Sequence, residues 1–143
     1  VADVTRRVMP PHVPQNLPAG SSEIPFVILD GDLSRRFVPV VLEGARSRKE
    51  VLMLIDTGAQ ITMIDRELAD DLDIEHVQDV QIVGVSGVAP GWVGRLRSLR
   101  LGDEEVSQLH IMVGPLPGMR LLGMDVVSAL KLTIGQKALE RGR

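Results

Sequence analysis

At the centre of the chain stands the sequence Val51-Leu52-Met53-Leu54-Ile55-Asp56-Thr57-Gly58-Ala59. Its first five residues are apolar and include no turn-former, which is typical of a strand buried on both faces. The run ends at Asp56, and an aspartate is costly to bury unless it is hydrogen-bonded or has a chemical task. Thr57 can fix a backbone with its hydroxyl group, and Gly58 lets a neighbouring main chain approach because it has no Cβ. The sequence therefore predicts a buried strand that ends at a functional carboxylate.

The length and composition predict one globular domain with a largely aliphatic core. The chain has 143 residues, of which 44 % are apolar and 24 % are charged, as in ordinary globular proteins. Only 2 % are aromatic, so the core must be built from valine, leucine, isoleucine and methionine. The net charge is −3, and the arginines are scattered rather than massed. Nucleic-acid binding is therefore not expected.

The chain contains no cysteine, which excludes disulfides, cysteine-ligated zinc and thiol catalysis but leaves the compartment open. No apolar run approaches membrane-spanning length, so we expect a soluble domain, with the cytoplasm favoured. A membrane anchor would require a segment outside this chain. The three histidines lack metal-ligand spacing, and the acidic cluster at 70–75 lacks the glycine and glutamate of a calcium loop. We expect no metal and no other cofactor.

The pattern of elements divides the chain into three parts. Residues 1–24 contain four prolines and predict an extended arm, either a disordered leader or a segment that packs along the body. Residues 25–135 form the folded domain, with Asp65 as the N-cap of a short helix and a second helix at 125–130. Strands are predicted at 25–29, 36–42, 51–55, 61–64, 80–85, 93–101, 109–113 and 132–134. Residues 136–143 are polar and are expected to form a loose tail.

One order of features occurs twice: strand, turn, strand, apolar pair, glycine and short helix. The first copy covers residues 37–72 and the second covers residues 97–130. Leu54-Ile55 precedes Asp56-Thr57-Gly58 in the first copy, whereas Leu121-Leu122 leads directly to Gly123 in the second. This pattern predicts a pseudo-twofold duplication in which only the first half kept an aspartate. The alternative is a chance recurrence of the turns and glycines common in β-rich chains.

Asp-Thr-Gly after a hydrophobic strand resembles the active-site motif of the aspartic proteases. The single copy and the short chain narrow the likeness to the retropepsin-like branch, and the likeness extends from about residue 37 to residue 134. It implies an all-β fold, namely a small closed acid-protease barrel with one short C-terminal helix, that forms a twofold homodimer. Gln60 and Met124 stand where viral members usually have an acidic and a basic residue. A cellular or bacterial member therefore fits better than a virus-encoded one.

Peptide hydrolysis by carboxylates requires two of them, one to take a proton from water and one to protonate the departing nitrogen. No second Asp-Thr-Gly or Asp-Ser-Gly occurs, because Asp32, Asp65, Asp103 and Asp125 all lack the residues that would follow. The second carboxylate must then be Asp56 of another copy. A twofold axis would bring the two together, so the expected partner is a second copy of this chain in an obligate homodimer.

The resemblance assigns roles to individual residues. It implies that Asp56 is the catalytic carboxylate, that Thr57 hydrogen-bonds across the dimer axis, and that the Gly58 amide orients the carboxylate. Ala59 and Gln60 would line the substrate cleft. The hairpin at 83–92 falls where the family has its mobile flap, and Gly84, Gly87 and Gly91 give the backbone freedom that opening needs. Four residues of this hairpin are predicted to bind the substrate: Val85, Ser86, Gly87 and Val88.

The predicted function is that of a homodimeric aspartic endopeptidase, which hydrolyses peptide or protein substrates with water activated between two Asp56 carboxylates. The flap at about 83–92 would close on the substrate, and the N-terminal arm would be a candidate self-cleavage site. Three alternatives remain open at this point. The fold can serve as a non-catalytic, dimerising peptide-binding module; the chain can be a generic β-domain with an accidental Asp-Thr-Gly; and the hairpin can be exposed without a task.

Overall fold

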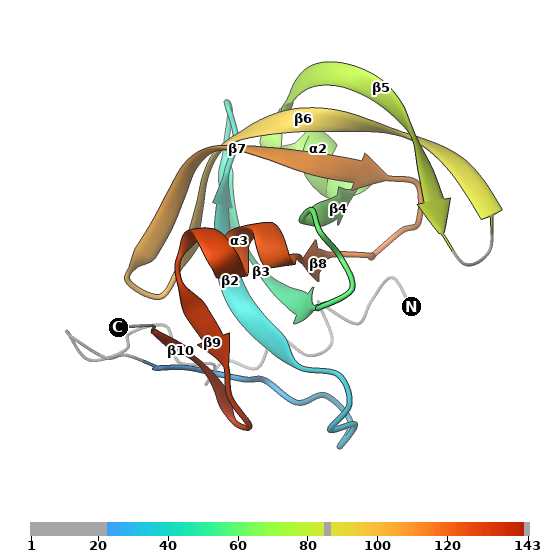
Figure 1. Ribbon diagram of the computed structural model, residues 1–143. Helices are drawn as coiled ribbons and strands as arrows, with labels where there is room; N and C mark the ends of the chain where they lie inside the picture. Colours follow the sequence, from blue (N-terminus) through green and yellow to red (C-terminus); the bar gives the residue numbers. More distant parts are fainter. Residues whose placement is uncertain (1–22, 85–86, 142–143) are drawn as a thin grey trace.

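The computed structural model describes residues 23–84 and 87–141, and the statements below concern this part of the chain (Figure 1). Almost all of the proline-rich arm predicted at 1–24 lies outside the described residues. The strands are β1 (Glu23–Pro25), β2 (Phe37–Glu43), β3 (Arg48–Ile55), β4 (Met63–Asp65), β5 (Glu75–Gly84), β6 (Gly87–Leu101), β7 (Glu104–Gly114), β8 (Leu121–Leu122), β9 (Leu132–Ile134) and β10 (Ala138–Arg141). The helices are α2 (Arg66–Leu72) and α3 (Met124–Ala129). The predicted all-β fold with one short C-terminal helix is confirmed.

The main sheet has seven strands in the order β2-β3-β8-β4-β7-β6-β5. Strand β2 also pairs with β6, from Val41 opposite Arg100 to Glu43 opposite Ser98. Because β2 pairs with both β3 and β6, the sheet closes on itself, as the prediction of a small barrel requires. Strands β5 and β6 continue beyond this closure as a long hairpin that arches over the barrel (Figure 1).

Two parallel pairings join the halves of the predicted duplication. Strand β3 pairs with β8, with Leu54 opposite Leu121, and β4 pairs with β7, with Ile64 opposite Val113. Each half thus places its own short strand beside a longer strand of the other half. This reciprocal arrangement agrees with the pseudo-twofold repeat that the sequence predicts.

The core is aliphatic, as the composition predicts. Strand β3 contributes Val51 and Met53 to the core cluster and also buries Leu52, and α2 packs against this core through Leu68 and Leu72. Further fully buried side chains come from strands on every side: Leu42, Ile64, Leu96, Leu99, Leu101, Ile111 and Leu122. Neither α2 nor α3, the two helices in the described ranges, is long and apolar enough to cross a membrane.

The C-terminal segment differs from its prediction as a loose tail. Residues 138–141 form β10, which lies between β1 and β9 in a second, three-stranded sheet. Ala138 and Leu139 are buried there, and Arg141 forms ion pairs with Asp103 and Glu104. The two apolar residues were too few to predict a strand, and the pairing with β1 joins segments more than a hundred residues apart.

Asp65 also differs in part from its prediction. It stands at the N-cap position of α2, but its side chain makes no cap hydrogen bond. Its carboxylate is instead occupied by two groups from the loop between β7 and β8. The helix therefore starts where the sequence predicts, while the carboxylate bonds elsewhere.

Candidate active site

The backbone around Asp56 is held on both sides. Strand β3 pairs with β2 along its length and with β8 at its end. The Asp56 amide donates to the Leu122 carbonyl at 3.1 Å, and the Ala59 amide donates to the Asp56 carbonyl at 3.1 Å. The strand therefore ends just before Asp56, as the sequence predicts, and Asp56 begins a tight turn whose backbone is held by hydrogen bonds.

The carboxylate of Asp56 accepts a hydrogen bond from the Gly58 amide at 2.9 Å. A Cβ at position 58 would lie only 3.3 Å from the same carboxylate oxygen, so a larger residue there would crowd the group. The contact predicted for Gly58 is thus present, whereas the catalytic role of both residues stays a prediction. The Asp56 side chain is half-buried, and Thr57 and Gln60 beside it are exposed.

A buried network beneath this turn joins the two halves of the chain. The amide and hydroxyl of Thr62 donate to the Asp125 carboxylate at 3.1 and 2.8 Å, and the Gly123 amide donates to the Thr62 hydroxyl at 3.0 Å. The Met124 amide donates to the Ala59 carbonyl at 2.9 Å. Residues 56–62 are therefore fixed against residues 122–126. Sequence reasoning missed Thr62, although a single polar residue between Ile61 and Met63 was the available signal.

Each of the other aspartates considered as a second carboxylate has its own partner. Asp32 accepts hydrogen bonds from the hydroxyl and amide of Ser34, which hold the pKa of Asp32 below its ordinary value. The remaining three bond as follows: Asp65 with Gly118 and Arg120, Asp103 with Arg141, and Asp125 with Thr62. Within residues 23–84 and 87–141, no group of three or more histidine, aspartate or glutamate side chains could hold a metal ion.

The flap predicted at 83–92 is a hairpin of β5 and β6 whose tip projects beyond the end of β7 (Figure 1). The last pairs before the tip are Val83 with Val88 and Gly84 with Gly87. Val83 and Val88 are apolar yet 78 % and 61 % exposed. Val85 and Ser86, both predicted to bind substrate, lie outside the described residues.

The glycines of this hairpin have different roles. Gly84 has open space around it, and Gly87 adopts a positive φ of 122°, a conformation that favours glycine. Gly91 is buried, and a Cβ there would collide with the Ile82 side chain and the Val113 carbonyl. Gly91 therefore allows close packing at the barrel rather than the freedom of motion that the sequence suggests.

Polar and aromatic contacts hold the base of the hairpin. His76 lies 2.8 Å from Asp79 and stacks on the ring of Trp92, with 4.8 Å between ring centroids. Glu75 and Arg95 form an ion pair across the same two strands. These contacts anchor the hairpin at the barrel.

A family model described as aspartyl protease matches residues 38–126, more than half of the chain. The match includes Asp56, the hairpin and Asp125. No curated protein sequence matches the chain significantly.

Two solved structures share its fold. The EIAV protease complexed with the inhibitor HBY-793 is 17 % identical with a TM-score of 0.59, over 76 % of this chain and 99 % of that one. A retropepsin-like aspartic protease from Rickettsia conorii is 17 % identical with a TM-score of 0.62, over 85 % of this chain and 94 % of that one. The chain therefore belongs to the aspartyl protease family and has the retropepsin-like fold.

Proposed function

We propose that this protein is an aspartic endopeptidase that acts as a homodimer, with its catalytic water held between the Asp56 carboxylates of two subunits. The observation that carries the proposal is a single half-buried carboxylate on a rigid, exposed turn, held by the Gly58 amide. The other candidate aspartates are bonded elsewhere. Membership of the aspartyl protease family supports the same chemistry.

The proposed reaction needs one proton shared between the two carboxylates. Two carboxylates close enough to hold one water molecule between them would repel each other strongly if both were negatively charged. The ionised carboxylate takes a proton from water as the water oxygen attacks the peptide carbonyl carbon. The protonated carboxylate gives its proton to the amide nitrogen as the carbon–nitrogen bond breaks. The products are a carboxylic acid and an amine, and the pair holds one proton again at the end.

A twofold axis beside the turn would bring the two Asp56 residues together. Thr57 is exposed in a single chain although it lies only two residues beyond the end of β3, which is expected for a residue that meets a second copy. We propose that the Thr57 hydroxyl hydrogen-bonds across this axis. Ala59, Gln60 and hairpin residues 85–88 would then line the cleft and bind an extended peptide by its backbone.

The experiment that tests this function is cleavage of a peptide library between about pH 3 and pH 7, together with the mass of the protein in solution. We expect cleavage that is favoured by acid, carried out by a species with twice the mass of one chain. A dimer that binds peptides without cleaving them would favour a peptide-binding module. An active monomer would contradict the shared pair of carboxylates.

Replacing Thr57 by valine should weaken the dimer, because the isosteric side chain loses its hydroxyl group. We expect the protein concentration at which half of the activity is lost to rise by about tenfold, which corresponds to one or two hydrogen bonds. The measurement is activity against dilution. Thr133→Val is the matched control, since Thr133 is exposed on β9, and it should leave the dilution curve unchanged. If both variants give the same curve of activity against dilution, Thr57 does not contribute to the dimer interface.

A further inference from the structure

The loop between β7 and β8, residues 115–120, is built around a tight turn. It starts after Gly114, which pairs with Asp65 where β4 and β7 end together. The Met119 amide donates to the Leu116 carbonyl at 3.2 Å, so residues 116–119 form a β-turn. Pro117 is its second residue, and Gly118, with a φ of 76°, is its third. This combination is typical of a type II turn, whose backbone is rigid.

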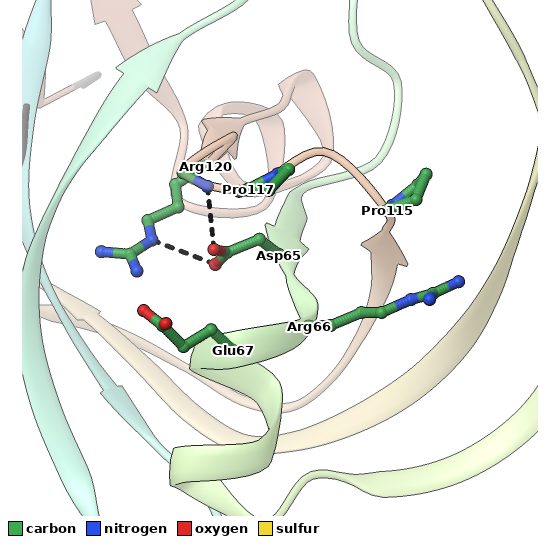
Figure 2. Close-up of a pocket in the computed structure, with 7 residues that line it drawn as sticks. Asp65, Arg66, Glu67, Pro115, Pro117 and Arg120 are labelled. Atoms are coloured by element: carbon green, nitrogen blue, oxygen red, sulfur yellow. Dashed lines mark hydrogen bonds and ion pairs between the residues drawn. The ribbon is translucent and has the colours of Figure 1, made fainter. Parts of the chain in front are cut away.

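The carboxylate of Asp65 holds this loop from below. Asp65 is only 3 % exposed. One of its oxygens accepts from the Gly118 amide at 2.9 Å. The other accepts from Arg120 Nε at 3.2 Å, and Figure 2 shows the Arg120 side chain beside this carboxylate. Because the backbone of Asp65 pairs with Gly114, this one residue binds the loop at its start, at its turn and at its exit.

The exit of the loop is in register with the strand that carries Asp56. The Arg120 carbonyl accepts from the Leu54 amide at 2.9 Å, and two residues further the Leu122 carbonyl accepts from the Asp56 amide at 3.1 Å. These two hydrogen bonds therefore fix the register of the loop exit relative to the turn at Asp56.

The turn carries two apolar side chains and lies on the side of the molecule where the hairpin tip lies (Figure 1). Leu116 is 53 % exposed and Met119 is half-buried. In Figure 1 the loop runs from the end of β7 down to β8 on the same side as the tips of β5 and β6. An extended peptide between Asp56 and the hairpin would meet this turn at its edge.

A buried ion pair contributes little net stability, because the cost of removing two charges from water offsets most of their attraction. The Arg120 side chain is 13 % exposed and that of Asp65 is 4 % exposed. Such a pair is well suited to fixing a geometry, since moving either residue breaks a charge-assisted hydrogen bond in a largely buried place.

We propose that Asp65 and Arg120 are positioning residues that hold the turn at 116–119 as one wall of the peptide cleft. They do not touch the peptide themselves. They act through Leu116 and Met119, whose placement relative to Asp56 they fix, and so they determine how tightly a substrate side chain fits beside the scissile bond. This inference rests on the proposed peptidase function for its kinetic consequences.

The test compares Asp65→Asn, Arg120→Met and the double variant. We expect each single variant to raise KM by roughly tenfold with little change in kcat, because a displaced wall weakens binding more than chemistry. Each single variant should also unfold at a lower temperature, since the remaining charge keeps its desolvation cost but loses the attraction between Asp65 and Arg120. The double variant should recover the unfolding temperature, while its KM should stay as high as in the single variants.

In the double variant the unfolding temperature should thus recover while KM does not. An ion pair that only stabilised the fold would not give this result. If KM recovers together with the unfolding temperature, or does not change in any variant, the positioning role is contradicted while peptide hydrolysis stands. The control is the exposed pair of Arg100 and Glu105 on β6 and β7, whose replacement should change neither quantity.

Hydrogen exchange provides a readout that does not need activity. The Gly118 amide should exchange faster in Asp65→Asn than in Glu105→Gln, because its acceptor is weakened. If the wild type cleaves no peptide, the proposed function fails, and exchange at Gly118 still decides whether Asp65 holds the turn. Unchanged exchange would overturn the inference on its own.

Discussion

Replacement of Asp56 by asparagine should lower the rate of peptide hydrolysis by at least about a thousandfold and leave the fold intact. Asparagine has nearly the same shape and can still accept the hydrogen bond that the Gly58 amide donates to Asp56. It cannot take a proton from water, so a pair with two asparagines has no base. The measurement is kcat/KM on a peptide from the library, at equal concentrations of folded protein.

The matched control for this change is Asp103→Asn. Asp103 is also an aspartate in a turn, but its partner is Arg141 on β10, and the pair is partly exposed. We expect this variant to keep nearly full activity. Activity of Asp56→Asn within a few-fold of that of Asp103→Asn would show that another group performs the chemistry.

Replacement of Gly123 by alanine should prevent the two halves of the chain from packing beside the turn at Asp56. A Cβ at this position would lie 2.8 Å from the Ile61 carbonyl carbon and 2.9 Å from the Thr62 amide nitrogen. Both atoms belong to the backbone of the segment that follows Asp56, so neither can rotate away. We expect a loss of at least about 3 kcal/mol in the free energy of unfolding, or roughly 10 °C in unfolding temperature.

Gly84→Ala is the control for this prediction. Gly84 is exposed at the hairpin tip, and a Cβ there would have nothing within 4 Å. The control should unfold at the wild-type temperature at the same protein concentration. If thermal unfolding shows the same stability for both alanine variants, the segments beneath Asp56 are not packed as tightly as described.

Much of the fold could be predicted because local pattern and tertiary structure agree. The apolar run at 51–55 is a central strand, and Gly123 stands where two segments of backbone meet. Strand β10 could not be predicted in this way. Its first two residues, Ala138 and Leu139, are adjacent and both buried, so the strand shows no alternation of apolar and polar residues.

The turn at Asp56 was visible in the sequence, whereas its support was not. Asp56 and Gly58 are two residues apart, and their contact follows from a short motif. Thr62 and Asp125 are 63 residues apart in the chain, and nothing local indicates that they bond. The same holds for Asp65, which has the sequence position of a helix cap but bonds a loop that follows it by more than fifty residues.

The central claim is that one active site needs Asp56 from two chains, and mixing subunits tests it most directly. Wild type and Asp56→Asn are combined in equal amounts, exchanged by unfolding and refolding together, and assayed against wild type treated alone. Half of the wild-type chains then have an inert partner, so activity per wild-type chain should fall to about one half. Activity per wild-type chain that stays unchanged would contradict the shared site.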